Sequence, residues 1–109
     1  MNNFLPYGRQ SISEEDVQAV AEVLRSDWLT TGPAVDAFEK AVTDFSGAAH
    51  AVAISNGTAA LHAAMKAAEI GPGDEVIVSS MTFVATSNAV VYQGGTPVFA
   101  DVDPETLLV

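Results

Sequence analysis

Cysteine, basic side chains and long apolar runs are scarce or absent in this sequence of 109 residues. The absence of cysteine excludes a disulfide framework and thiol chemistry, and it fits a cytoplasmic protein. Four Lys and Arg residues stand against fourteen Asp and Glu residues, and the formal net charge of −10 argues against a nucleic-acid-binding surface. Because the overall field repels anions, we expect local backbone amides to hold any anionic ligand.

Membrane and secretion signals are also missing. No apolar run approaches the roughly 20 residues of a membrane span, so we expect no membrane partner. Residues 1–6 have no basic region followed by a long apolar stretch, so we expect no signal peptide. Hydrophobic residues nevertheless make up 49% of the sequence, which predicts a packed globular unit.

Residues 1–48 predict an irregular arm followed by two helices. Ser13 can cap the first helix, because acidic residues fill the next three positions and Asp16 completes a pattern like a capping box. We expect this helix to end near Ser26. Gly32 and the following proline predict the start of the second helix, and Gly47 predicts its end.

Residues 49–109 predict strands and helices in alternation. The apolar runs 50–54, 75–79 and 97–100 read as strands, and the stretches 58–69 and 82–93 between them read as helices. Short connections in this order predict right-handed βαβ crossovers and a parallel sheet. The expected fold class is therefore α/β, with three parallel strands in βαβαβ order preceded by two helices. Three strands are few for a sheet covered on both faces, so we expect the start of a larger domain.

Residues 54–61, Ile-Ser-Asn-Gly-Thr-Ala-Ala-Leu, are the candidate ligand site. They predict a strand, a tight turn and the first turn of a helix, whose free amides and dipole attract anions. Gly57 leaves room for a ligand and Thr58 adds a hydroxyl, so this turn could cradle a phosphate group. The alternative is that Ser55, Asn56 and Thr58 only cap the helix, as every βα junction requires.

Phe83 follows the second expected strand, at the same end of the sheet as Gly57. An aromatic residue there usually belongs to the core, but it can also offer a flat face to a planar ligand. A phosphate cradle beside an aromatic plate suits a flat phosphorylated cofactor such as pyridoxal phosphate.

Other chemistry finds little support. There is neither a GxGxxG fingerprint nor a P-loop, and His50 and His62 lack the spacing of metal ligands. Asp101 and Asp103 could form a metal or hydroxyl site at a strand end, although a turn-forming pair is the favoured interpretation. We therefore expect no metal site.

Five runs together resemble the DegT/DnrJ/EryC1/StrS sugar aminotransferases, which are fold-type-I enzymes that use pyridoxal 5'-phosphate. The runs keep the order of that family and cover nearly the whole chain. The opening run PYGRQSI, residues 6–12, is similar to the branch that makes the amino-sugar precursor of pseudaminic acid. The five runs are SDWLTTGP (26–33), SNGTAAL (55–61), GPGDEV (71–76), TFVAT (82–86) and GTPVFADVD (95–103).

The resemblance implies roles for particular residues. Beside Gly57, the amides of Thr58 and Ala59 and the Thr58 hydroxyl would hold the cofactor phosphate, and Phe83 would stack on the pyridine ring. The family transfers an amino group from an amino acid, usually glutamate, to a keto-sugar nucleotide. Near the sugar-nucleotide site, in part across a homodimer interface, would lie Tyr7, Gly8, Trp28, Thr30 and Thr31.

The resemblance also implies that two catalytic groups of the family are missing from these residues. The family's Schiff-base lysine and the aspartate that pairs with the pyridine nitrogen lie beyond residue 109, and neither Lys40 nor Lys66 matches the lysine motif. We therefore expect a truncated chain that has no catalytic residue and is inactive alone. Two other hypotheses remain open: a non-catalytic module that binds a phosphorylated ligand or a full-length subunit, and a decaying gene product without a stable fold.

Overall fold

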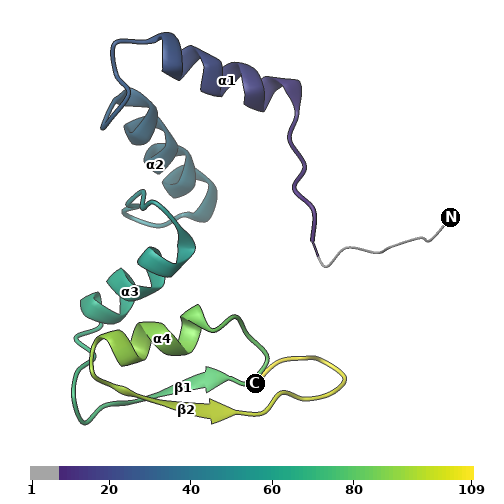
Figure 1. Ribbon diagram of the computed structural model, residues 1–109, viewed down its shortest axis with the longest axis vertical. Helices are drawn as coiled ribbons and strands as arrows, with labels where there is room; N and C mark the ends of the chain where they lie inside the picture. Colours follow the sequence, from purple (N-terminus) through teal and green to yellow (C-terminus); the bar gives the residue numbers. More distant parts are fainter. Residues whose placement is uncertain (1–7) are drawn as a thin grey trace, which may run out of the picture. The chain divides into compact units, whose positions relative to one another are not determined.

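The computed structural model describes residues 8–109, which divide into two compact units between Ala53 and Ile54. The first unit, described from Gly8 onward, holds two helices, and the second holds two helices and two strands (Figure 1). The elements in order are α1 (Glu14–Arg25), α2 (Pro33–Ser46), α3 (Gly57–Ala67), β1 (Glu75–Ser79), α4 (Ala85–Tyr92) and β2 (Thr96–Ala100).

The ends of α1 follow the pattern that the sequence predicts. The Asp16 amide donates to Ser13 Oγ at 3.3 Å, and the Ser13 amide donates to Asp16 Oδ2 at 2.8 Å, which closes a capping box. Ser26 ends the helix and returns its hydroxyl to the Val23 carbonyl. The predicted start and end of this helix are confirmed.

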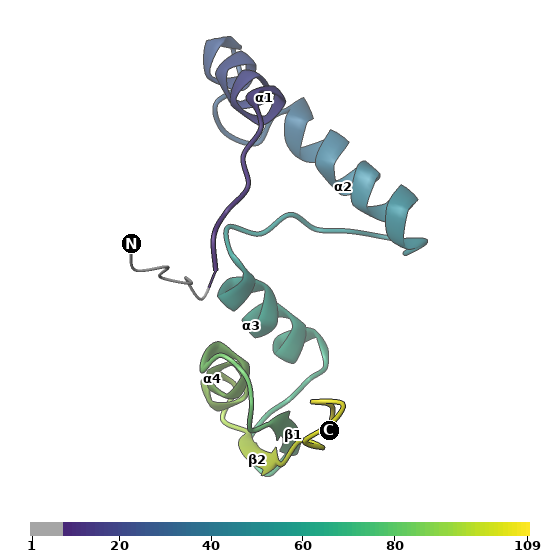
Figure 2. The ribbon, with the colours of Figure 1, turned by 90° about the vertical axis from the view of Figure 1, so that its right-hand side faces the viewer.

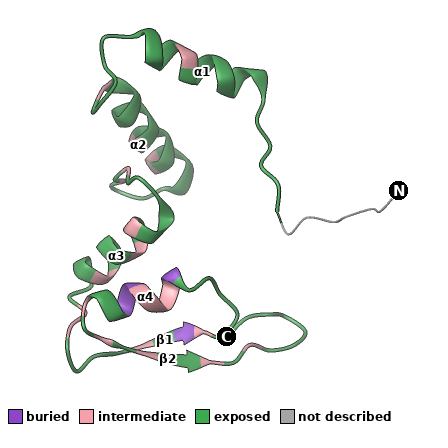
Figure 3. Ribbon diagram, in the orientation of Figure 1, coloured by how far each residue is buried: buried purple, intermediate pink, exposed green. Residues whose placement is uncertain are grey.

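The ends of α2 are also confirmed. Gly32 precedes the helix, Pro33 occupies its first position, and Gly47 ends it in the left-handed region with φ 74°. No residue of α1 or α2 is buried (Figure 3). The apolar side chains of both helices therefore stay largely exposed in this unit.

The second unit contains the core. Strands β1 and β2 pair in parallel, with Glu75 opposite Thr96 and Ser79 opposite Ala100. Helix α4 contacts both strands and α3 contacts α4, so α4 lies between α3 and the sheet (Figure 2). The buried apolar residues all belong to β1 and α4, namely Val78, Ala85, Ala89 and Val90.

The first predicted strand, 50–54, is wrong for the described residues, although the α/β class and the parallel sheet are confirmed. A strand exists only where a neighbour accepts its amides, and here the Ala53 amide donates to the Glu39 carboxylate, Oε1, at 2.7 Å. Val52 is 77% exposed. The sheet in residues 8–109 is therefore two-stranded.

Among the described helices, none has both the length and the apolar character needed to cross a membrane.

Candidate functional site

Asn56 organises the first turn of α3. Its backbone is extended, and its side-chain oxygen Oδ1 accepts the Ala59 amide at 2.9 Å. Its carbonyl accepts the Ala60 amide at 3.1 Å, which is the first hydrogen bond of the helix ladder. Asn56 thus caps the helix, as the capping interpretation predicts.

The cap leaves two amides of that turn available. Among the described residues, no acceptor bonds to the amide of Gly57 or Thr58. Apart from its chain neighbours and the nearby backbone of its own helix, no heavy atom lies within 4 Å of the position that a Cβ of Gly57 would take, so no other side chain crowds Gly57. Two free donors at the positive end of a helix dipole fit a phosphate group.

Phe83 lies at the same end of the unit as this turn. Helices α3 and α4 both begin at the end where β1 and β2 finish, and Phe83 lies in the connection just before α4 (Figure 1). Its side chain is 75% exposed, so it is not a core residue within this unit. An exposed ring at the same end of the unit as two free amides suits a flat anion.

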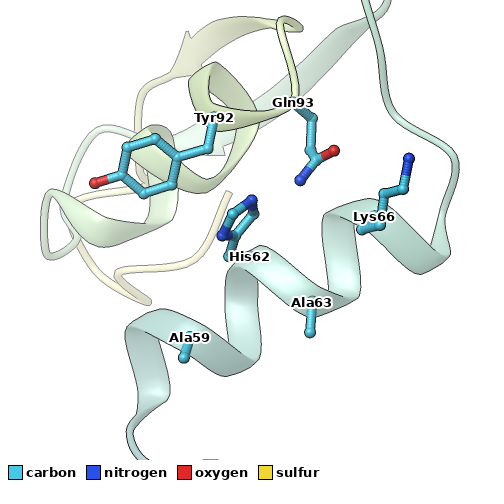
Figure 4. Close-up of a pocket in the computed structure, with 6 residues that line it drawn as sticks. All are labelled: Ala59, His62, Ala63, Lys66, Tyr92 and Gln93. Atoms are coloured by element: carbon cyan, nitrogen blue, oxygen red, sulfur yellow. The ribbon is translucent and has the colours of Figure 1, made fainter.

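A shallow groove runs between α3 and the end of α4 (Figure 4). Its volume is about 570 Å³, and the rings of His62 and Tyr92 lie across it with centroids 5.3 Å apart and planes tilted by 59°. This aromatic pair joins the two helices, which the sequence analysis did not anticipate, because the two residues are distant in sequence. The groove is lined by Ala59, His62, Ala63, Lys66, Tyr92 and Gln93.

Lys66 lies well along α3 from the turn at Gly57 and Thr58. Lys66 follows Gly57 by nine positions on α3, which corresponds to about 14 Å along the helix axis. Lys40 belongs to the other unit, where its Nζ pairs with Asp44 Oδ2 at 2.7 Å. A lysine side chain reaches only about half of that axial distance, so Lys66 cannot bridge it.

The residues expected near the sugar nucleotide belong to the first unit. Trp28, Thr30 and Thr31 share the connection between α1 and α2, where Trp28 is 58% exposed and Thr31 has φ 43°. A Cβ added to Gly32 would lie 2.7 Å from the Cβ of Trp28, so the tryptophan packs closely over the start of α2. Gly8 is exposed, and Tyr7 lies outside the described residues.

The two aspartates after β2 differ in their bonding. Asp103 Oδ1 accepts the amides of Glu105 and Thr106 at 2.9 and 2.8 Å, which is the turn that the sequence analysis favours. These bonds, the one from the Thr106 amide first, lower the pKa of Asp103 below its ordinary value. Asp101 instead accepts the Ser80 hydroxyl from the connection after β1, at 3.2 Å.

Solved structures share this fold. Spr1654 from Streptococcus pneumoniae, solved in a PLP form, superposes with a TM-score of 0.85 and 35% identity over 94% of this chain and 26% of its own. The same protein is also solved in a PMP form with the same likeness. The fold is therefore part of the α/β fold of the aminotransferases that use pyridoxal phosphate.

Residues 10–109 match the model of the DegT/DnrJ/EryC1/StrS aminotransferase family, and the chain belongs to that family. The spore coat polysaccharide biosynthesis protein SpsC of Bacillus subtilis (strain 168) is 54% identical over 106 residues, which are 97% of this chain and 27% of that protein. The UDP-4-amino-4-deoxy-L-arabinose–oxoglutarate aminotransferase of Shewanella sediminis (strain HAW-EB3) is 49% identical over 107 residues, 98% of this chain and 28% of that protein. The chain thus spans about a quarter of the length of the curated relatives that it matches. The predicted family and its cofactor, pyridoxal 5'-phosphate, are confirmed.

Proposed function

We propose that these 109 residues are the N-terminal, cofactor-phosphate-binding part of a nucleotide-sugar aminotransferase. The observation that carries the proposal is the first turn of α3, where Gly57 and Thr58 offer amides that bond to no acceptor among the described residues, at the end of the unit where Phe83 also lies. The Gly57 and Thr58 amides, with the Thr58 hydroxyl, would hold the phosphate. The Ala59 amide, which donates to Asn56 Oδ1, would donate to the phosphate as well.

Phe83 would face the ring of the cofactor. Its exposed side chain offers a flat apolar surface, and stacking on that surface fixes the ring plane while the phosphate fixes one end. Pyridoxal phosphate, when bound, supplies an electron sink for amino-group chemistry. The residues of this chain contribute binding and orientation, and none of them is proposed to be catalytic.

The substrates follow from the family and its members. We infer an amino-acid donor, glutamate, and a keto-sugar nucleotide acceptor, because the two relatives above carry names from polysaccharide biosynthesis and nucleotide-sugar amination. Tyr7, Gly8, Trp28, Thr30 and Thr31 are proposed to contact the sugar nucleotide within a homodimer. The pseudaminic acid branch and the cytoplasmic location stay predictions.

We further propose that these 109 residues alone do not transaminate. Lys66 lies too far along α3 from the turn proposed to bind phosphate, and the Nζ of Lys40 pairs with Asp44. The alternative function is a non-catalytic module that binds a phosphorylated ligand or another subunit. The amides of Gly57 and Thr58, which bond to no acceptor among the described residues, support both hypotheses.

An absorbance titration of the purified chain with pyridoxal phosphate tests the proposal. We expect weak, saturable binding that inorganic phosphate competes away, with no cofactor retained on gel filtration and no turnover of a keto-sugar nucleotide. Loss of competition by phosphate would contradict the cradle, and measurable transamination would contradict the inactivity of the chain. Co-purification with a full-length aminotransferase would favour the interaction module.

A further inference from the structure

We propose that Asp101 is a positioning residue that fixes the backbone carrying Phe83. The inference deepens the proposed function and rests on it, because it assigns to Asp101 the task of presenting the ring that faces the cofactor. Asp101 itself is not proposed to touch the cofactor.

The first observation is a contact between the segments that follow the two strands. Ser80 Oγ donates to Asp101 Oδ1 at 3.2 Å, and the Ser80 amide donates to the Ala100 carbonyl at 2.9 Å. The same oxygen of Asp101 accepts the Val102 amide at 2.9 Å. One carboxylate oxygen therefore fastens the chain leaving β1 to the chain leaving β2, three residues before Phe83.

The second observation is that the far side of the same loop is also held. The Thr86 amide donates to the Phe83 carbonyl at 3.0 Å, and the hydroxyls of Thr82 and Thr86 lie 2.9 Å apart. Phe83 thus lies between two fixed points, the Ser80–Asp101 contact and the first turn of α4.

Because Phe83 is exposed, the contacts that hold its backbone determine how its ring is oriented. Its side chain is 75% exposed, so burial within the unit does little to orient it. The ring direction then depends on the backbone, and a fixed backbone reduces the entropy that a ligand must remove on binding. A carboxylate is a strong acceptor for such a tie, since hydrogen bonds to charged groups exceed those between neutral groups.

Asp103 provides a matched comparison within the same stretch. Among residues 8–109, its carboxylate accepts hydrogen bonds from Glu105 and Thr106 of its own turn and none from the Phe83 loop. Removing Asp103 should therefore loosen residues 103–108 and leave residues 80–86 unchanged. Comparing substitutions at Asp101 and at Asp103 therefore separates an effect on the Phe83 loop from the general effect of losing an acidic side chain.

The test measures hydrogen exchange of the residue-80 and Thr106 amides in the ligand-free chain. In Asp101→Ala and in Ser80→Ala we expect exchange of the residue-80 amide to rise about tenfold, since each variant removes the hydrogen bond between positions 80 and 101. Asp101→Asn keeps an oxygen acceptor and should retain the protection. Asp103→Ala should raise exchange at Thr106 and leave Ser80 as it is.

Unchanged exchange of the residue-80 amide in both Asp101→Ala and Ser80→Ala would overturn the proposal. If Asp101→Ala fails to fold, Ser80→Ala decides alone, because it removes one exposed hydroxyl. Titration with pyridoxal phosphate then separates the two proposals. We expect Asp101→Ala and Ser80→Ala to bind pyridoxal phosphate about three- to tenfold more weakly, because the loop is no longer preorganised.

Loosened exchange with unchanged cofactor affinity would also overturn the role of Asp101. Absence of cofactor binding in the unsubstituted chain would instead remove the proposed function, and the exchange result would still decide whether Asp101 fixes the loop.

Discussion

The side-chain oxygen of Asn56 accepts the amide of Ala59 at 2.9 Å, in the turn where the cofactor phosphate is proposed to bind. The cap therefore occupies one of the amides that an anion would use, and it leaves those of Gly57 and Thr58. Cap and ligand share one helix end, so the chemistry of residue 56 should affect both helix stability and anion affinity.

Replacement of Asn56 by aspartate separates these two effects. Asn56→Asp keeps a good capping oxygen, so the thermal midpoint should change little. It adds a negative charge at the anion site, and we expect affinity for pyridoxal phosphate to fall by about tenfold or more. Asn56→Ala should show the converse, a loss of roughly 1 kcal/mol of stability with affinity changed less. Equal affinity in Asn56→Asp and the unsubstituted chain would contradict a phosphate site in this turn.

Removal of the Phe83 ring should weaken cofactor binding without unfolding the unit. Because the side chain is 75% exposed, Phe83→Ala should leave the thermal midpoint nearly unchanged. Loss of the stacking surface should reduce affinity by about 1 kcal/mol, or roughly fivefold, in the absorbance titration. Phe99→Ala is the matched control, since this ring is 60% exposed on β2 and should leave affinity unchanged.

A methyl group at Gly32 should disturb the connection that carries Trp28. Its Cβ would lie 2.7 Å from the Cβ of Trp28, so the tryptophan must move. We expect Gly32→Ala to cost about 1–2 kcal/mol and to shift the emission of the only tryptophan. Gly8→Ala is the control, because nothing lies within 4 Å of its Cβ position. A Trp28 spectrum identical in all three chains would show that the connection tolerates the methyl group.

The turn at Asp103 should loosen in acid. Hydrogen bonds from the amides of Thr106 and Glu105 lower the pKa of Asp103, so the folded turn favours the ionised carboxylate. Its contribution is complete above the ordinary aspartate pKa of about 4 and is lost as the pH falls through the lowered pKa. Amide shifts of Thr106 between pH 6 and pH 2 should follow this titration, and Asp103→Asn should abolish it. A midpoint at or above pH 4 would contradict the lowered pKa.

Local signals predicted the helix ends well. Ser13, Gly32 and Gly47 each act on amides or carbonyls within a few residues, so sequence spacing suffices to place them. The run 50–54 has the composition of a strand, but a strand also needs a neighbour that accepts its amides. In the described chain Glu39 accepts the Ala53 amide, and no local pattern could show that.

The candidate site also has a local part, which the sequence predicted, and a long-range part, which it did not. The turn at Gly57 and Thr58 is a pattern of adjacent residues, and the sequence alone located it. The contact of Ser80 with Asp101 joins residues 21 positions apart. The strand register was the available signal: once Ser79 is opposite Ala100, the next residues of the two strands must be neighbours.

The parallel pairing of β1 with β2 has a consequence for how this unit folds. Glu75 and its partner Thr96 are 21 positions apart, and the buried residues of the unit all lie on the two elements β1 and α4. Closing such a short crossover costs little chain entropy. During synthesis the β1–α4–β2 segment can therefore close as soon as Ala100 has left the ribosome, before later residues compete for its apolar surface.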